Sequence, residues 1–295
     1  MIKNTLLTVL LVCFGSSIIS AQEFSYGFKA GLNFSQIKTD DIEQFEAQDL
    51  ESFTQNSGFH LGILFNTKFS DYFGLSLEML FSQKGGRYEY DGPSYAILNS
   101  AIGDERVTRF GTRTMNLNTA NSYFDLPVSV YVKPVKWLEL SAGVNVGLLI
   151  SSTASGQLVF REETQLEDNS FKGITLDYRY YSDEPGEVAD GNVGSEVRMI
   201  NGVSLEIPKT ITAYYDYPDG AETGLYKRFD LGVHAGMKLF INSSLFIGGR
   251  VNLGLSDITN EEVDRSLQDK DGSDLIYRDD KDTNLSIQAS IGFSF

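Results

Sequence analysis

The chain has 295 residues, of which 22% are charged and 41% hydrophobic, enough for one large domain or two small ones. Aspartate and glutamate number 40 against 24 lysine and arginine, giving a formal net charge of −16. This acidic excess argues against a nucleic-acid partner, because phosphate binding requires a basic surface. The mean hydropathy of −0.16 excludes a bundle of membrane helices. It does not exclude a membrane β-barrel, in which apolar and polar residues alternate.

Residues 1–21 are predicted to be a signal peptide. A lysine near the start supplies positive charge, and the apolar run at 6–14 is too short to span a bilayer. The small residues Ser20 and Ala21 then provide a cleavage site. The expected organisation is therefore a signal peptide followed by one domain at 22–295.

The single cysteine, Cys13, lies inside this predicted signal peptide. A lipid-attachment site needs a small residue just before the cysteine, and Val12 does not fit that pattern. Cleavage would remove Cys13, so the mature chain is expected to have no disulfide, thiol nucleophile or thiolate metal site.

Apolar and polar residues alternate with a period of two along eight segments of the mature chain. This pattern is typical of β-strands with one apolar face. Most of these segments are as long as the tilted strands of about 9–11 residues that cross a bilayer. The predicted strands are 24–35, 59–69, 75–84, 123–133, 138–150, 229–239, 245–255 and 284–295.

Short and long connections alternate between these strands. Short turns are predicted at 70–73, 134–136 and 242–243, and long loops at 38–57, about 85–121, about 152–228 and 256–283. Outer-membrane barrels have this asymmetry, with turns on the periplasmic side and loops outside the cell. The sequence therefore predicts an all-β, eight-stranded antiparallel up-and-down transmembrane β-barrel in the cell outer membrane, with long extracellular loops.

The apolar face of the strands is expected to contact lipid. This face is almost entirely large and apolar, whereas the other mixes glycine and serine with ionisable groups, which suits a narrow lumen filled by side chains. A soluble, lipocalin-like barrel with its apolar face inside is the alternative. Aromatic residues near the predicted turns favour the membrane barrel, because they resemble an interfacial belt. They are Phe24, Phe69, Tyr72, Phe73, Trp137, Phe240, Phe246 and Phe293.

The longest loop, 152–228, contains two shorter alternations at 174–180 and 211–217. Both are rich in tyrosine, and we predict that they form a hairpin that projects above the membrane. A ten-stranded barrel is the alternative. Exposed tyrosines are also typical of surfaces that bind glycans or proteins.

Six strand regions carry sequence motifs: GFKAGLNFSQ (27–36), LSLEMLFSQKGG (75–86), YFDLPVSVYVK (123–133), LSAGVNVGLLIS (140–151), FDLGVHAGMKL (229–239) and FIGGRVNLGLSDI (246–258). Together they resemble the PorT-like outer-membrane β-barrel family. The resemblance implies a barrel fold and no catalytic site, and the namesake of the family is associated with protein secretion across the outer membrane. The terminal strand ending in Phe295 is similar to the signal by which such proteins are recognised. The barrel-assembly machinery is therefore an expected partner.

The inward face of the predicted barrel carries many ionisable groups. Charges buried in a narrow lumen must pair, so we interpret them as a structural network, with a proton or ion path as the alternative. Counting back from the predicted turns places His60 near Lys84 and His234 near Arg250. Both pairings bring positive groups together, so acids are expected to reach across the lumen. The expected network comprises Lys29, Glu78, Asp125, Asp230, His234 and Arg250.

The sequence gives little support for catalysis. It contains no GxSxG motif and no phosphate-binding glycine loop, and its two histidines, His60 and His234, have no metal-ligand spacing. We therefore expect no enzymatic activity and no cofactor.

Two predicted loops hold most of the negative charge. Residues 38–57 have six acids and one base, and residues 256–283 have ten acids and four bases. Solvation at the cell surface explains such charge, and calcium binding is a second reading. Asp269, Asp271, Ser273 and Asp280 resemble ligands of a calcium loop. Asp274 stands where that loop has glycine, and no helices flank it.

The sequence thus predicts a structural or surface protein that binds a partner or ligand through long acidic extracellular loops. Its expected partners are outer-membrane lipid, the barrel-assembly machinery and an extracellular protein or glycan. An accessory role in outer-membrane protein secretion is the alternative. A small channel or a barrel enzyme is less favoured, because charged side chains crowd the lumen.

Overall fold

The computed structural model describes residues 23–102, 106–162, 175–182, 195–200, 202–208, 211–212, 224–271 and 274–295. The predicted signal peptide lies outside these described residues, so its assignment stays a prediction. Within them, no helix has the length and apolar character that crossing a membrane requires.

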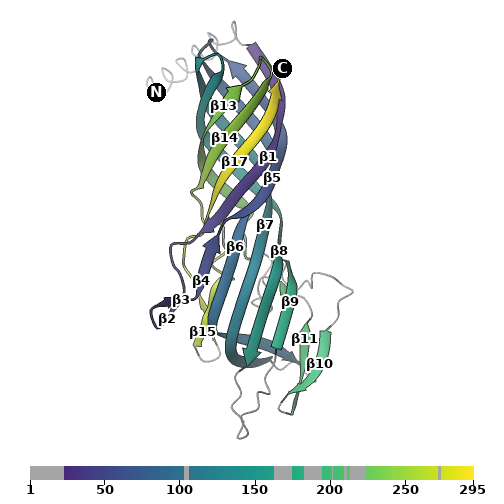
Figure 1. Ribbon diagram of the computed structural model, residues 1–295. Helices are drawn as coiled ribbons and strands as arrows, with labels where there is room; N and C mark the ends of the chain where they lie inside the picture. Colours follow the sequence, from purple (N-terminus) through teal and green to yellow (C-terminus); the bar gives the residue numbers. More distant parts are fainter. Residues whose placement is uncertain are drawn as a thin grey trace, which may run out of the picture.

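Eight antiparallel strands form a closed ring (Figure 1). They are β1 (Glu23–Lys38), β5 (Asn56–Lys68), β6 (Phe73–Ser100), β7 (Arg106–Val135), β8 (Leu138–Glu162), β13 (Phe229–Phe240), β14 (Leu245–Gly254) and β17 (Thr283–Ser294). Each is hydrogen-bonded to the next in this order. β17 closes the ring onto β1, with Gly27 opposite Ser294. The predicted eight-stranded antiparallel barrel is confirmed.

The ten-stranded alternative is wrong. β9 (Thr175–Ser182) pairs with β8 at 153–161, whereas β13 pairs with β8 at 138–148. β9 therefore extends the sheet beyond the ring instead of entering it. In the described residues, the second tyrosine-rich segment forms β12 (Ile211–Thr212), which pairs in parallel with β9. The two alternations therefore do not form the antiparallel hairpin expected of them there, and residues 213–217 lie outside the described ranges.

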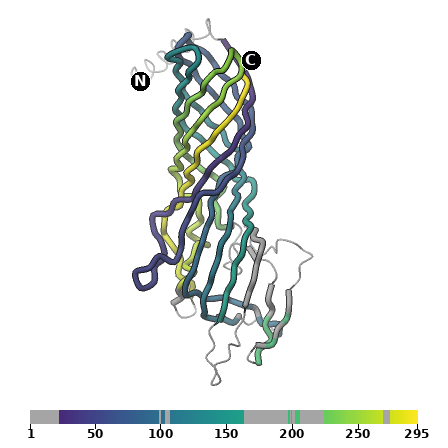
Figure 2. The backbone as a smooth tube through the Cα atoms, in the orientation of Figure 1, coloured from purple at the N-terminus to yellow at the C-terminus, as the bar shows by residue number. Residues whose placement is uncertain are grey.

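The barrel has a turn end and a loop end. Residues 69–72 join β5 to β6, residues 136–137 join β7 to β8, and residues 241–244 join β13 to β14. β1 begins and β17 ends at this same turn end (Figures 1 and 2). The remaining connections lie at the opposite, loop end, as the alternation of short and long connections predicts.

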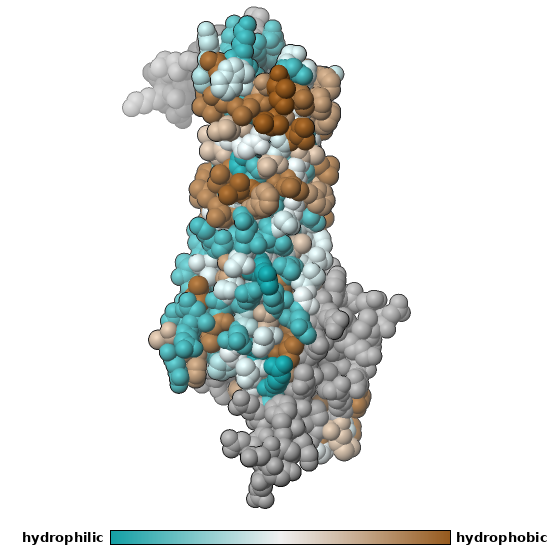
Figure 3. Space-filling model, viewed as in Figure 1, coloured by the Kyte–Doolittle hydropathy of each residue, from teal (hydrophilic) through white to brown (hydrophobic). Residues whose placement is uncertain are grey.

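The apolar face of the strands lies outside. In β1, Phe28 and Leu32 are exposed by 50% and 55%, whereas Lys29 and Asn33 are buried. On the face that Figure 3 shows, hydrophobic residues form bands over the barrel, and most of the coloured residues beyond it are hydrophilic. A soluble barrel would need the reverse arrangement, so the exterior of this ring suits a lipid environment.

Aromatic side chains gather at the turn end, as predicted, with two exceptions. Phe24, Tyr72 and Trp137 are exposed there, where they can lie at the membrane interface. Phe246 is buried with 1% exposure, and its ring packs 5.6 Å from that of Phe240, which has the same inward parity as Lys238. The assignment of Phe240 and Phe246 to the outer belt is wrong, because their positions in β13 and β14 have the inward parity.

β6 and β7 continue beyond the barrel where a loop is predicted. Their pairing runs on from Lys84 opposite Asn121 to Asn99 opposite Arg106, so the prediction of a loop at about 85–121 is wrong. Gly85 of β6 has a φ of +134° and Gly156 of β8 one of +148°. Residues with side chains rarely adopt this backbone conformation. Gly85 lies between the part of β6 that pairs with β5 and the part that pairs with β4. Gly156 lies in the part of β8 that pairs with β9.

The part of the sheet beyond the ring, called here the outer sheet, comprises the outer parts of β6, β7 and β8 and the strands that join them. β4 (Glu51–Thr54) and β11 (Val203–Pro208) pair with β6. β10 (Ser195–Ile200) pairs with β11. The small hairpins are β2 (Gln44–Phe45) with β3 (Gln48–Asp49), and β15 (Arg265–Asp271) with β16 (Asp274–Tyr277).

The outer sheet has a hydrophobic core of its own. Tyr95 helps to fix β15 to the sheet, because its hydroxyl donates a hydrogen bond to the carbonyl of Ser266 at 2.9 Å. Burial of apolar side chains stabilises the packing of the hairpin and the loops against the strands. The core residues are Leu50, Tyr90, Ala96, Leu98, Met115, Leu117, Ala154, Leu158, Phe160, Leu205 and Leu267.

A positive charge on the lipid-facing surface of the barrel should be destabilising. Val144 is 55% exposed near the middle of the part of β8 that belongs to the ring, 138–148. Val144→Arg is expected to lower the free energy of unfolding by about 2–4 kcal/mol, the cost of arginine at the bilayer midplane. Urea unfolding in lipid vesicles, followed by the fluorescence of Trp137, measures this. Ile276→Arg, on the outer hairpin, should change stability by less than about 0.5 kcal/mol; equal losses in both variants would contradict the membrane placement.

Candidate functional site

The centre of the lumen holds a buried ion-pair cluster. Glu78 lies between Lys29 and Arg250, with a nitrogen–oxygen distance of 2.6 Å to each. All three side chains are less than one-tenth exposed. The strands β1, β6 and β14 thus place three members of the expected network in direct contact across the lumen.

A second cluster lies toward the loop end of the lumen. The Lys84 ammonium is 2.9 Å from Asp125 Oδ1 and 2.9 Å from Asp230 Oδ2. Asn284 donates a hydrogen bond to the same oxygen of Asp230 at 3.0 Å. A Cβ atom at Gly147 would lie 2.6 Å from Asp125 Oδ1, so glycine leaves the room that this cluster needs.

A third cluster lies toward the turn end. Glu139 accepts ion pairs from Lys238 at 2.8 Å and from Lys133 at 3.3 Å. Lys238 Nζ also lies 5.4 Å from the ring centre of Phe246, and Lys133 Nζ lies 4.5 Å from that of Phe240. The rings of Phe240 and Phe246 thus pack beside the two ammonium groups, and all five residues line an open cavity at this end of the lumen.

The histidines belong to hydrogen-bonded pairs. His60 Nδ1 is 2.7 Å from Asn33 Oδ1, and His234 Nε2 is 2.7 Å from the Ser129 hydroxyl. His234 is therefore in the lumen, as expected, but bonds to a serine there. Lys84 is the central residue of the second cluster and Glu139 that of the third. Neither is among the six residues of the expected network.

The predicted neighbours across the strands are displaced by two residues. His60 lies opposite Ser82 instead of near Lys84, and His234 lies opposite Asn252. The turns at 69–72 and 241–244 are longer or shifted relative to the predicted ones. A shift of two preserves the inward face and changes the neighbours.

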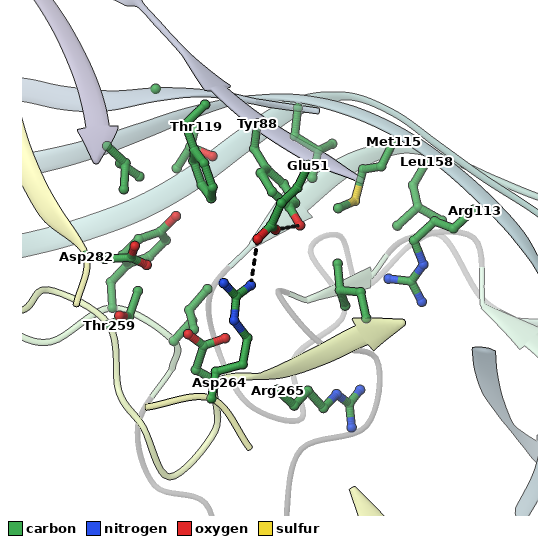
Figure 4. Close-up of a pocket in the computed structure, with 18 residues that line it drawn as sticks. Glu51, Tyr88, Arg113, Met115, Thr119, Leu158, Thr259, Asp264, Arg265 and Asp282 are labelled. Carbon is green, nitrogen blue, oxygen red and sulfur yellow. Dashed lines mark hydrogen bonds and ion pairs between the residues drawn. The ribbon is translucent and has the colours of Figure 1, made fainter. Parts of the chain in front are cut away.

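A pocket lies between the loop end of the barrel and the outer sheet. It has about 800 Å³ of empty space, including its open mouth. Figure 4 shows side chains from the strands on one side and from the connections before β15 and β17 on the other. Its apolar walls include Phe53, Met115, Leu117, Leu158 and Leu225.

One side of the pocket is a satisfied polar network. The Glu51 carboxylate accepts an ion pair from Arg278 Nη1 at 3.0 Å and a hydrogen bond from the Tyr88 hydroxyl at 2.8 Å. Arg278 Nη2 also lies 2.8 Å from Asp280 Oδ2. Burial would lower the pKa of Arg278, but the carboxylates of Glu51 and Asp280 raise it above its usual value. This network fixes β4 to the segment that leads into β17.

Arg113 differs from Arg278 in its contacts. Its Nη2 donates a hydrogen bond to the carbonyl of Tyr95 at 2.9 Å, and its Nε is buried with no hydrogen-bond partner. No carboxylate of the described residues forms an ion pair with it. Burial lowers the pKa of this guanidinium. Figure 4 shows it beside Met115 and Leu158, so a positive group lies next to apolar walls.

Three carboxylates meet next to this network. Oxygens of Asp264, Asp280 and Asp282 lie within 4.8 Å of one another. Burial, together with the charges of Asp280 and Asp264, raises the pKa of Asp282 to about 7. This cluster contains Asp280 from the predicted calcium loop. The side chains of Asp269 and Asp271 and the whole of Ser273 lie outside the described part, so that calcium loop stays a prediction.

Sequence patterns alone miss Arg113, Glu51, Asp264 and Asp282. Arg113 belongs to a segment predicted to be a loop, so nothing indicates that it faces a pocket. The acids are expected only as part of the loop charge. The pairing of β4 with β6 brings Glu51 to the pocket, opposite Tyr90. These residues are far apart in the sequence, and local periodicity does not predict such a pairing.

The family model for the outer membrane protein beta-barrel domain matches residues 20–260. The chain belongs to this family. The protein is therefore an outer-membrane β-barrel, whose turn end is periplasmic and whose outer sheet and pocket are extracellular. The matched description is broader than the PorT-like family, and comparison with curated proteins gives no match.

Solved structures similar to this chain include other bacterial barrels. Ail, the attachment invasion locus protein of Yersinia pestis, solved in complex with the heparin analogue sucrose octasulfate, is 11% identical with a TM-score of 0.34; 92% of this chain and 99% of that chain are covered. Neisserial surface protein A is 10% identical with a TM-score of 0.29; 93% of this chain and 98% of that chain are covered. The translocator domain of the autotransporter NalP from Neisseria meningitidis is 9% identical with a TM-score of 0.23; 99% of this chain and 96% of that chain are covered. Similarities at this level carry no argument about a ligand.

Proposed function

We propose that this outer-membrane barrel binds a surface ligand in its extracellular pocket. The ligand would be a small molecule that joins an apolar part to an anionic group. The observation that carries this proposal is Arg113, a guanidinium with a shielded Nε that no described carboxylate neutralises. A second, enzymatic role is not proposed.

Physical chemistry favours an anion at this position. A buried charge without a counterion raises the free energy of the folded protein. Hydrogen bonds from the guanidinium to an anion would offset this cost. Arginine offers a planar fork of donors that suits carboxylate, sulfate or phosphate groups. The walls of Met115, Leu117 and Leu158 would contact the apolar part. Such a combination of apolar walls and a few polar groups is typical of small-molecule sites.

The lumen supports a role at the surface. The three ion-pair clusters, centred on Glu139, Glu78 and Lys84, lie at successive levels of the barrel. An eight-stranded barrel has an interior that side chains can fill. A solute path through it would have to break buried ion pairs, which disfavours a channel.

Naphthalene-2-sulfonate is a suitable probe of the pocket, because it has both chemical features. Wild-type protein in lipid nanodiscs is expected to bind it saturably in isothermal titration calorimetry. Arg113→Met should weaken binding about 10- to 100-fold, the value of one or two charged hydrogen bonds. Naphthalene-2-methanol, which has no charge, should bind both proteins equally.

Arg87→Met is the matched control. Arg87 lies on β6, the strand next to the β7 strand of Arg113. Its side chain is 42% exposed and pairs with Glu89 at 3.0 Å. It should leave sulfonate binding unchanged. Absence of saturable binding to the wild type, or equal loss in both arginine variants, would contradict the proposal.

The PorT-like resemblance and the secretion role that it suggests remain predictions. They rest on the strand motifs and not on the pocket. Normal secretion in a strain that lacks the gene would remove the secretion role while leaving the ligand proposal untouched.

A further inference from the structure

Three buried carboxylates converge where the outer loops meet the barrel. Asp264 follows the turn after β14, whereas Asp280 and Asp282 lie just before β17. Their exposed fractions are 7%, 8% and 6%, and their ligand oxygens lie within 4.8 Å of one another. Like charges held this close in a shielded place repel each other strongly, so the arrangement needs a compensating positive charge.

Two oxygens in this cluster lack partners. Oδ1 of Asp280 and Oδ1 of Asp282 are buried and accept no hydrogen bond from the described residues. Both residues are more than nine-tenths buried. Figure 4 shows Asp282 and Asp264 on the same side of the pocket, near Thr259. Buried oxygens of this kind are rare in folded proteins unless water or an ion satisfies them.

A neighbouring aspartate shows the contrast. Asp257 Oδ1 accepts hydrogen bonds from the backbone and hydroxyl of Thr259, at 3.3 and 3.0 Å, and from the backbone of Asp282 at 3.0 Å. Its Oδ2 lies 2.6 Å from Lys227 Nζ. The same loops can therefore satisfy a carboxylate completely. The unpartnered oxygens of Asp280 and Asp282 are a specific feature of the cluster.

Arg278 supplies part of the compensation. It is shared between Glu51 Oε1 and Asp280 Oδ2, and it leaves the Oδ1 atoms of Asp280 and Asp282 unbonded. Arg265 also lines the pocket, but Figure 4 shows its guanidinium directed away from Asp264 and Asp282. Asp280 and Asp282 therefore each present one carboxylate oxygen that Arg278 does not cover.

We propose that Asp264, Asp280 and Asp282 form a calcium site that ties the segment before β17 to the turn after β14. Calcium takes six to eight oxygen ligands from carboxylates, backbone carbonyls and water in flexible geometry, which irregular loops can supply. Magnesium demands near-ideal octahedral geometry and keeps several waters, so it fits these loops less well. The inference goes beyond the pocket ligand, because the ion would hold the loops whatever the pocket binds.

Calcium titration of the full mature protein, extracted from outer membranes and stripped with chelator, tests the site. The wild type is expected to bind one calcium ion with a dissociation constant of about 10⁻⁴ to 10⁻³ M, as extracellular modules do. Asp264→Asn combined with Asp282→Asn should weaken binding at least about tenfold, since affinity follows the number of charged ligands. The double variant should stay folded without calcium, because asparagine removes the repulsion between the carboxylates.

Asp279→Asn is the matched control, since Asp279 is exposed in the same segment and should leave calcium binding unchanged. Arg113→Met should also bind calcium normally, which separates this inference from the ligand proposal. Calcium should protect the outer segment from protease in the wild type and not in the double variant. Absence of saturable calcium binding to the wild type, or equal binding by the double variant, would overturn the site. Tighter binding of magnesium would overturn the choice of metal.

Discussion

Glu78→Gln is expected to lower the free energy of unfolding of the barrel by about 3–5 kcal/mol, the usual cost of breaking a buried ion pair from one side. Glutamine preserves the shape of the side chain but removes its charge. Lys29 and Arg250, both 2.6 Å from the Glu78 carboxylate, would then be two buried cations without a counterion. Urea unfolding in lipid vesicles, monitored by heat-modifiable gel migration and the fluorescence of Trp137, measures the loss.

Glu23→Gln provides the control for this prediction. Glu23 pairs with Lys68 at 3.0 Å, but its side chain is 78% exposed. Exposed pairs contribute about 0–1 kcal/mol, so this variant should unfold nearly as the wild type does. Adding Lys29→Met to Glu78→Gln should recover part of the loss, because it removes one unpaired cation. If both glutamine variants were equally stable, the central cluster would not hold the barrel together.

Phe160→Ala is expected to open the outer sheet while the barrel stays intact. Phe160 is 1% exposed in the hydrophobic core of that sheet, and truncating a buried phenylalanine costs about 3–5 kcal/mol. Hydrogen exchange should therefore rise along the outer parts of β6, β7 and β8. The barrel parts of the same strands have their own ladders and lumen contacts, so their protection should not change.

Phe110→Ala is the corresponding control, because Phe110 lies on β7 of the same sheet but is 59% exposed. It should leave exchange in the outer sheet close to that of the wild type. Heat-modifiable migration reports the barrel in both variants. Loss of that migration in Phe160→Ala would show that the outer sheet and the barrel unfold together, which would contradict their separate cores.

Period-two alternation predicts the barrel because one physical rule governs every membrane strand. Lipid contacts one face and the crowded lumen contacts the other, so parity alone places Lys29 inside and Phe28 outside. Phe246 is 1% exposed because its parity is inward. Parity thus determines the position of this side chain more strongly than its aromatic character does.

Register and the outer sheet are less accessible to sequence patterns. The position of a turn decides which residues lie opposite each other. Placing the turn after β5 one residue too late therefore predicts Lys84 as the neighbour of His60, whereas the structure has Ser82 there. Beyond the membrane, water replaces lipid and the requirement for strict alternation ends. β6 and β7 are therefore predicted as a loop, although they pair as strands to Asn99 and Arg106.

The pocket depends on contacts that no local pattern encodes. Glu51 and Arg278 are far apart in the sequence but lie 3.0 Å apart, because β4 adds to β6 and the segment before β17 folds back over it. Arg113 is one basic residue among several in its segment, and only the packing around it leaves its Nε shielded and unpartnered. Charge in the loops indicates an outer surface, whereas the fold determines which charges stay unsatisfied.

Planar-bilayer recording of the purified protein tests most directly that this barrel is sealed and acts through its extracellular part. The clusters around Glu139, Glu78 and Lys84 cross the lumen at three levels. We expect no conductance above background for the wild type at neutral pH and moderate salt. A steady conductance with a defined unit size, carried by correctly folded protein, would contradict it.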